Sequence, residues 1–223
     1  MIGDKLVITD YHRSAAAKIF DRLSALINAD QEIIAATIAG ESGCGKSETA
    51  AVLASLCKAD GFKTIVLQQD DYFKLPPKKN HQKRLADISW VGPGEVQLCL
   101  LEANINAIKS RLASKLTKPL VNYELNLITE EILDLVNLKV IIVEGTYTTM
   151  LKNVDFKAFI NRTFYQTKKA RLKRSRDPAS NFLEKVLLIE HEIIAAHKYF
   201  ADIIIPPPNE EIELSIMDDQ DYK

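Results

Sequence analysis

The sequence contains few cysteines and carries almost no net charge. Its 223 residues include three cysteines, Cys44, Cys57 and Cys99, and its formal net charge is −1. The cysteine spacing does not match a metal site, and sparse thiols are typical of a reducing compartment, so we expect a cytoplasmic protein. A near-zero net charge creates no overall field that attracts nucleic acid or an anionic membrane. We therefore expect neither as a partner.

Long hydrophobic runs are also missing. No apolar run reaches 18 residues, so the sequence predicts no transmembrane helix. The segment Met1–Lys5 lacks a basic stretch followed by an apolar core, so a signal peptide is not expected. Internal repeats and low-complexity linkers are absent as well. We expect a single domain over residues 1–223, with a helical extension at 1–32 and an acidic tail at 206–223.

The most specific feature that is present is the segment Gly40-Glu41-Ser42-Gly43-Cys44-Gly45-Lys46-Ser47. It matches the G-x-x-x-x-G-K-[ST] pattern of a phosphate-binding P-loop (Walker A) and stands between an apolar run and a helix-like stretch. Glycines let the backbone turn its N–H groups toward an anion, and the start of the helix adds a positive dipole end. A glycine-rich turn that binds nothing is the alternative. The residues predicted to bind the nucleotide are Gly40, Ser42, Gly43, Cys44, Gly45, Lys46, Ser47 and Glu48.

Two of these residues have individual roles in the predicted site. Lys46 is expected to reach the β- and γ-phosphates, and the Ser47 hydroxyl to ligate Mg²⁺. Cys44 allows two interpretations: a thiol whose pKa falls beside the anion site, or a position that tolerates any small residue. We favour the second.

Alternating apolar and amphipathic segments predict an α/β fold with a doubly wound parallel sheet. Strands are expected at residues 33–39, 63–68, 139–143, 159–165 and 201–205. Helices are expected at residues 13–29, 48–60, 94–114, 167–175 and 180–200, and residues 71–92 are expected to form a loop.

Acidic residues follow two of the predicted strands, at the edge where such sheets bind ligands. Asp70 and Asp71 follow the second strand, and adjacent residues there point in opposite directions, so we expect only one to face the site. A carboxylate in that place can accept a proton from a substrate hydroxyl or hold a Mg²⁺-bound water. Glu144 follows the strand at 139–143 and is expected to contact the Mg²⁺ shell or the acceptor. The alternatives are an acidic turn cap and a plain strand-to-turn junction.

The segment from Lys168 to Asp177 is strongly basic, with six cationic side chains in ten residues. A solvated helix face is one interpretation. A nucleic-acid patch is another, although no aromatic residues are interleaved with the basic ones. We favour a helical lid whose arginines close over the transferring phosphoryl group. The cationic segment 74–84 either meets an acidic or phosphorylated acceptor or is a solvated loop, and His12, His191 and His197 are interpreted as structural.

In these motifs the chain resembles the uridine kinase and phosphoribulokinase-like branch of P-loop kinases. The resemblance covers roughly residues 33–205, and two segments beyond the P-loop are specific to this branch: Gln69–Phe73 and Tyr199–Pro206. It implies a P-loop NTPase fold with ATP and Mg²⁺ as cofactors. The resemblance also implies roles for single residues. Asp70 matches the general base, and Arg171 and Arg174 match the lid arginines. Glu144 matches the acid after the third strand.

The chain departs from the family on the acceptor side. Where the family often has Trp or Phe followed by Asp-His-Pro, this chain has Trp90-Val91-Gly92-Pro93, and Ile128 stands in place of a base-recognising histidine. We therefore expect an ATP- and Mg²⁺-dependent kinase whose partner is a small-molecule acceptor: a sugar, sugar acid, vitamin-like alcohol or nucleoside. The alternatives are a regulatory nucleotide-binding module and an ATP-binding kinase-like protein without transfer activity. A homodimer is left open.

Overall fold

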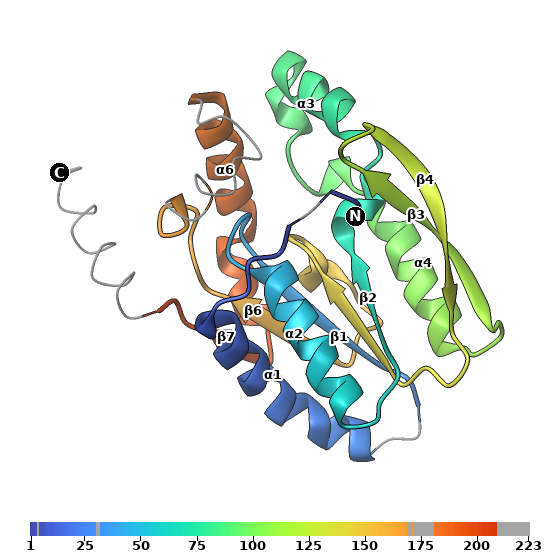
Figure 1. Ribbon diagram of the computed structural model, residues 1–223. Coiled ribbons are helices and arrows are strands. Elements are labelled where there is room, and N and C mark those ends of the chain that lie inside the picture. The colour runs from blue at the N-terminus through green and yellow to red at the C-terminus, as the bar shows by residue number, and fades with distance from the viewer. Residues whose placement is uncertain (4, 30–31, 169–170, 172–180, 209–223) are drawn as a thin grey trace.

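A five-stranded parallel sheet forms the centre of the protein (Figure 1). The computed structural model describes residues 1–3, 5–29, 32–168, 171 and 181–208. The strands of this sheet are β1 (Ile34–Gly40), β2 (Thr64–Gln68), β5 (Val140–Glu144), β6 (Phe156–Ile160) and β7 (Ile203–Ile205). Their order is β2-β5-β1-β6-β7, and every pairing between neighbours is parallel. The predicted α/β fold with a parallel sheet is confirmed.

Helices cover both faces of this sheet (Figure 1). On one face lie α1 (Asp10–Ala29) and α2 (Lys46–Ala59), and the other is covered by α4 (Leu98–Lys109) and the end of α6 (Asn181–Ile194). Side chains alternate along β1, so that Ala36 packs with α1 and α2 whereas Ala35 packs with α4. The sheet therefore has an apolar core on each face, as a doubly wound fold requires.

The amphipathic helix predicted at 13–29 is present as α1. Its apolar residues recur at helical spacing and are fully buried against α2 and the sheet: Ala15, Ala16, Ile19, Leu23 and Ile27. The helix begins three residues earlier than predicted, at Asp10, whose negative charge suits the positive end of the helix dipole.

The prediction of a loop over residues 71–92 was wrong for its middle part. Residues Pro77–Ala86 form helix α3, flanked by the short 3₁₀ segments Gln69–Tyr72, Ile88–Trp90 and Pro93–Glu95. Proline at the first helical position is pre-organised for a helix. The pattern was missed because α3 has no apolar face: among its residues only Asn80 is buried.

An antiparallel hairpin also went unpredicted. The helix expected at 94–114 ends at Lys109, and β3 (Lys115–Asn122) and β4 (Leu127–Asp134) pair with each other as a separate two-stranded sheet. Every position of β4 is exposed or half-buried, so this strand lacks the buried apolar run that marks a central strand.

Two further boundaries differ from the predictions. The strand expected at 159–165 lies earlier, at Phe156–Ile160, because this is the apolar run that pairs with β1. The helix expected at 180–200 is α-helical to Ile194 and continues as a 3₁₀ helix over Ala195–Phe200. Of the helix expected at 167–175 the structure describes only residues 167, 168 and 171, and most of the acidic tail lies outside the described residues.

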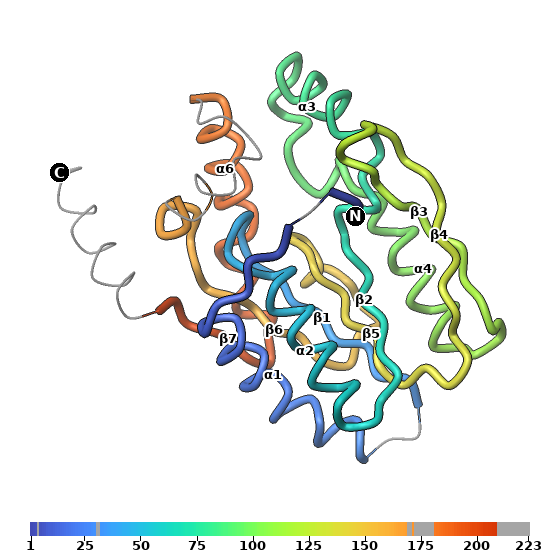
Figure 2. The backbone as a smooth tube through the Cα atoms, in the orientation of Figure 1, coloured from blue at the N-terminus to red at the C-terminus, as the bar shows by residue number. Residues whose placement is uncertain are grey.

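The first residues of the chain run along the hairpin. Ile2 pairs with Asn122 of β3, and its backbone oxygen accepts a hydrogen bond from the N–H of Tyr123. Figure 2 shows the N-terminus between the end of β2 and the hairpin. Met1 is thereby brought to the end of β2.

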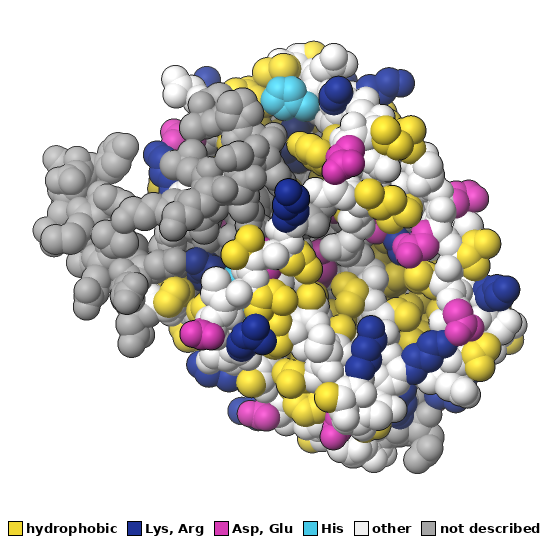
Figure 3. All heavy atoms as spheres, in the orientation of Figure 1, with side chains coloured by type: hydrophobic (Ala, Val, Ile, Leu, Met, Phe, Trp, Pro, Cys, Tyr) yellow, Lys and Arg dark blue, Asp and Glu magenta, His cyan; other side chains and the backbone are white. Residues whose placement is uncertain are grey.

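The described surface is mixed in charge. In Figure 3, Lys and Arg side chains are interspersed with Asp and Glu on the face that is shown. None of the helices within the described ranges combines the length and apolar character that a membrane span requires.

Candidate active site

The P-loop connects β1 to α2, as its sequence context predicted. Gly43 and Gly45 have left-handed φ angles of 81° and 101°, which residues other than glycine rarely adopt. A Cβ atom at Gly45 would also lie 2.5 Å from Nε2 of His12. The first N–H groups of α2 have no partner within the helix, and together with the helix dipole they form a site for an anion.

Lys46 lies at the centre of the described site. Its side chain is buried, and its Nζ donates a hydrogen bond of 2.9 Å to the backbone oxygen of Glu41. Burial alone would lower the pKa of Lys46, but nearby acidic groups, with Glu144 and Asp70 among them, raise it above its ordinary value. Lys46 therefore remains a cation, as phosphate binding requires.

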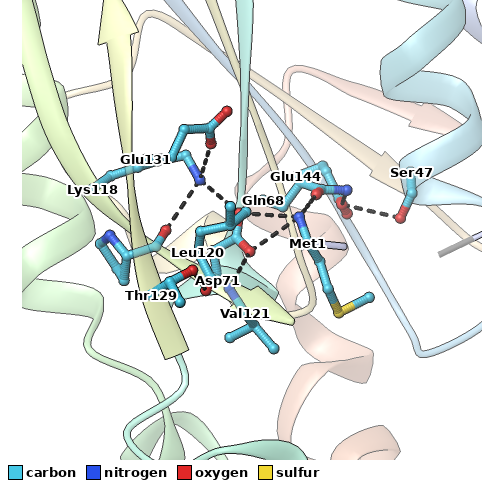
Figure 4. Close-up of polar contacts among 11 residues, drawn as sticks. Met1, Ser47, Gln68, Asp71, Lys118, Leu120, Val121, Thr129, Glu131 and Glu144 are labelled. Atoms are coloured by element: carbon cyan, nitrogen blue, oxygen red, sulfur yellow. Dashed lines mark hydrogen bonds and ion pairs between the residues drawn. The ribbon is translucent and has the colours of Figure 1, made fainter. Parts of the chain in front are cut away.

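The two adjacent acids after β2 have different surroundings, of which Figure 4 shows those of Asp71. Asp71 is buried and accepts hydrogen bonds from Lys118 Nζ at 2.7 Å and from the N–H of Val121 at 3.0 Å. The amino group of Met1 lies 3.0 Å from the same carboxylate. Asp70 makes no hydrogen bond or ion pair with the part of the chain that the structure describes. Asp71 thus fixes the hairpin to β2, and Asp70 is left available for a ligand.

The electrostatics of Asp70 suit a proton acceptor. Burial raises the pKa of its carboxyl group, and the charge of Lys46 only partly offsets this effect. A carboxylate with a raised pKa binds a proton more strongly than an ordinary aspartate does.

Glu144 lies beside the P-loop at the end of β5. Its Oε1 accepts hydrogen bonds from Ser47 Oγ at 3.0 Å and from Gln68 Nε2 at 3.3 Å (Figure 4). Burial and the negative charge of Asp70 raise the pKa of Glu144 to about 7. The Ser47 hydroxyl and the Glu144 carboxylate are therefore in direct contact.

These two oxygen donors fit Mg²⁺. Among the described residues, no cluster of three or more His, Cys, Asp or Glu side chains could hold a metal ion. Mg²⁺ at a nucleotide site retains several waters and takes phosphate oxygens, so that one or two protein oxygens suffice. Ser47 and Glu144 are the residues that would hold it.

The remaining predicted binding residues of the loop are buried or half-buried around this centre. Glu48 is fully buried in the first turn of α2, and so is Cys44 in the loop. Burial raises the pKa of the Cys44 thiol, contrary to the interpretation of a reactive thiolate.

Arg171 lies against the P-loop. Its Nη1 donates to the backbone oxygen of Phe164 and, at 2.7 Å, to Thr167 Oγ1. A Cβ atom at Gly43 would lie 2.7 Å from Cγ of Arg171, so the arginine side chain packs directly on this glycine. Arg174 and most of the predicted lid lie outside the described residues.

Helix α6 contributes two residues to the P-loop that the sequence did not indicate. Ser42 Oγ donates to Glu190 Oε2 at 2.6 Å, and His191 Nδ1 lies 2.7 Å from Glu41 Oε1. The Glu41 carboxylate also accepts the N–H of Phe164 at 2.6 Å. His191, interpreted as structural, is thus a direct neighbour of the phosphate loop.

Arg84 of α3 is a second cation near this edge of the sheet. Its Nε and Nη2 donate to the two oxygens of Glu95 at 2.6 and 2.9 Å. Glu95 is fully buried and also accepts from Asn80 Nδ2 and from the N–H of Gly92. Arg84 Nη2 lies 3.6 Å from Glu190 Oε1. For this residue, the interpretation of a solvated loop at 74–84 was wrong.

Comparison with known sequences finds two distant relatives. The bifunctional alpha-galactosidase/sucrose kinase AgaSK of Mediterraneibacter gnavus is 27% identical over 191 residues, which are 80% of this chain and 20% of that protein. The uridine kinase of Leuconostoc citreum is 25% identical over 187 residues, which are 78% of this chain and 88% of that protein. No family model matches the chain. The chain thus spans only about a fifth of the length of AgaSK.

Comparison with solved structures finds kinases of the same fold. The structure of a possible uridine kinase from Bacillus stearothermophilus has a TM-score of 0.56 at 16% identity, covering 84% of this chain and 99% of that one. Phosphoribulokinase from Rhodobacter spheroides has a TM-score of 0.60 at 14% identity, covering 79% of this chain and 71% of that one. The chain therefore has the fold of the P-loop kinases that include uridine kinase and phosphoribulokinase, the branch that its sequence motifs resemble.

Proposed function

We propose that the protein is an ATP- and Mg²⁺-dependent phosphotransferase that acts on a hydroxyl group of a small metabolite. The observation that supports this function best is the convergence of Lys46, Asp70 and Glu144 at the carboxyl ends of β1, β2 and β5. Lys46 is a cation that can bind phosphate, Asp70 is a carboxylate available to a substrate, and Glu144 is the proposed metal ligand.

The P-loop performs the first part of this chemistry. Its backbone N–H groups and Lys46 bind the β- and γ-phosphates, and Lys46 leaves the Glu41 oxygen to do so. Ser47 and Glu144 would hold Mg²⁺, which would supply positive charge that offsets the charge of the phosphate oxygens.

Asp70 is the proposed general base. It accepts the proton of the acceptor hydroxyl while the hydroxyl oxygen forms a bond to the γ-phosphorus. The bond between that phosphorus and the β–γ bridging oxygen breaks, and ADP leaves. We assign Arg171 and Arg174 to the phosphoryl oxygens, where they would stabilise charge and exclude water.

The proposed acceptor carries its hydroxyl on a carbohydrate or a similar alcohol. The names of the two relatives contain sucrose and uridine, and both compounds bear hydroxyl groups on a sugar ring. Val91 is apolar and 5% exposed at the position where the resemblance places a ribose-binding acid. This favours a sugar, sugar acid or vitamin-like alcohol over a nucleoside.

The test is transfer of radiolabelled phosphate from ATP and Mg²⁺ to a panel of sugars, sugar acids, vitamin alcohols and nucleosides. Lys46→Ala should abolish transfer, and Lys58→Ala, an exposed lysine at the other end of α2, should not change it. Asp70→Asn should lower the rate by roughly 10²–10⁴. If no panel member accepts phosphate although ATP binds, the regulatory or transfer-inactive alternative replaces this function.

A further inference from the structure

Helix α6 contacts the P-loop through two consecutive residues. Glu190 Oε2 accepts a hydrogen bond from Ser42 Oγ at 2.6 Å, and His191 Nδ1 lies 2.7 Å from Glu41 Oε1. Because a carboxylate only accepts hydrogen bonds, Nδ1 of His191 is the donor to Glu41. Two consecutive residues of the loop are therefore bound by two consecutive residues of one helix.

The two loop residues lie between glycines. Gly40 and Gly43 have φ angles of 148° and 81°, which residues other than glycine rarely adopt. Glycine leaves the chain more conformational freedom than any other residue does, so the order of a segment between two glycines has a high entropic cost. Contacts from outside the loop can meet this cost for Glu41 and Ser42.

The Glu41 side chain is held at both of its oxygens. Oε1 is bound by His191, and Oε2 accepts the N–H of Phe164 at 2.6 Å. The rings of His191 and Phe164 also pack edge to face, with 5.8 Å between their centroids. Lys46 is bound to the backbone oxygen of Glu41 and not to its carboxylate. Glu41 therefore keeps its side-chain contacts when Lys46 moves to a phosphate.

Glu190 is fixed from its other side. Its Oε1 lies 3.6 Å from Arg84 Nη2, and Arg84 is itself held by two hydrogen bonds to the buried Glu95, at 2.6 and 2.9 Å. Glu190 is buried as well. The carboxylate that binds Ser42 thus has a defined position before a nucleotide arrives.

Order of this kind favours phosphate binding. An anion is bound when the N–H groups of the loop converge on it. If the loop is ordered in advance, the entropic cost of ordering it is not subtracted from the binding free energy.

We propose that Glu190 and His191 are positioning residues for nucleotide binding, which hold Ser42 and Glu41 so that the P-loop is ordered before the phosphates of ATP bind. The inference rests on the nucleotide binding of the proposed function and does not depend on phosphate transfer. Both residues act through the P-loop and not by contact with the nucleotide.

The test is calorimetry with Mg²⁺ and a non-hydrolysable ATP analogue, on variants that circular dichroism shows to be folded. Glu190→Met and His191→Leu remove the hydrogen bonds with little change in side-chain size, and each should weaken binding roughly tenfold. Glu190→Gln keeps an acceptor oxygen and His191→Asn keeps an N–H donor, so both should stay within about threefold of the original affinity. In the transfer assay, the two apolar substitutions should raise the KM for ATP and leave that for the acceptor unchanged.

Two further measurements separate positioning from general damage. His197→Leu removes a similar hydrogen bond, 2.8 Å between His197 Nδ1 and Thr149 Oγ1, that involves no P-loop residue, and it should not change nucleotide affinity. Ser42→Ala combined with Glu190→Met forms a double-mutant cycle. The double variant should lose less affinity than the product of the two single fold-changes, because both substitutions remove the same hydrogen bond.

The outcomes are distinct. The positioning role is overturned by unchanged affinity in both apolar variants, by equal losses in the apolar and conservative variants, or by an equal loss in His197→Leu. Phosphate transfer with unchanged ATP affinity in the apolar variants refutes the positioning role and leaves the phosphotransferase intact. If the apolar variants bind the analogue more weakly but the unaltered protein phosphorylates no acceptor, the positioning role is supported and the proposed function is refuted.

Discussion

Asp70 and Asp71 are neighbours in the chain, yet they have opposite surroundings. Asp71 is buried in contact with Lys118, the amino group of Met1 and a backbone N–H. Asp70, by contrast, makes no hydrogen bond or ion pair within the described residues. A residue with saturated contacts contributes to folding, and a buried residue without contacts costs stability and is available for chemistry.

Substitution of the two aspartates should separate these contributions. Asp71→Asn removes the negative charge that pairs with Lys118 and the Met1 amino group, although Lys118 keeps Glu131 at 2.9 Å. It should lower the free energy of unfolding by about 1–3 kcal/mol. Asp70→Asn should leave that free energy unchanged or slightly raised, and should reduce phosphate transfer as described above. Urea unfolding monitored by circular dichroism, together with the transfer assay, checks both expectations. Equal destabilisation by the two substitutions contradicts the assignment.

The residues of the site differed in how well the sequence predicted them. The sequence pointed to Lys46 and Ser47 because the P-loop is a local motif whose eight residues are contiguous. It did not point to Glu190 and His191, because their hydrogen bonds to Ser42 and Glu41 join residues 148 and 150 positions apart. Without the fold, no spacing rule connects such residues.

At the scale of elements, the P-loop is held by segments that come from three parts of the chain. Glu41 binds the N–H of Phe164 and His191 of α6, and Arg171 packs on Gly43. Arg171 of the basic segment is therefore docked on the P-loop, and a change at Gly43 affects the position of the Arg171 side chain.

Two glycine substitutions test this docking. Gly43→Ala would place a Cβ atom 2.7 Å from Cγ of Arg171, whereas Gly61→Ala, also at a left-handed φ, meets nothing within 4 Å. Both should cost about 1–2 kcal/mol of unfolding free energy, because the backbone strain is alike. Only Gly43→Ala should also lower kcat for transfer, since it displaces Arg171. Equal kcat values in the two variants would show that Arg171 does not act on the phosphoryl group.

The elements themselves were predictable where burial is continuous. β1 and β5 are buried at every position, and such runs of apolar residues are readily recognised. α3 and β4 were missed because α3 is polar on all sides and β4 is at most half-buried. The position of α3 depends on Glu95, which lies outside the helix and binds its residues Asn80 and Arg84, and a local pattern does not contain this contact.

For the whole molecule, the crowded carboxylates make stability depend on pH. The pKa of Glu144 is about 7 in the folded protein, above its ordinary value of 4.5. Between these values the folded state holds the proton more tightly than the unfolded state, so the free energy of unfolding falls as pH rises. A shift of this size corresponds to a loss on the order of 3 kcal/mol across the window.

The dependence can be measured in protein freed of metal with EDTA. Chemical unfolding at pH values from below 4.5 to above 7 should give a decreasing free energy of unfolding, and Glu144→Gln should flatten the slope. Added Mg²⁺ and ATP should recover the loss at neutral pH, because a ligand that binds only the folded state stabilises it. An identical slope in Glu144→Gln would mean that another group is responsible.

The β3–β4 hairpin is a sheet of its own, fixed to the central sheet beside Asp70 through the ion pair of Asp71 and Lys118. Its turn, between Asn122 and Leu127, can therefore change in length or composition without disturbing the register of the strands that position the P-loop. Under the proposed function, this hairpin can be exchanged for that of another P-loop kinase while the P-loop keeps its place at the end of β1 in the central sheet.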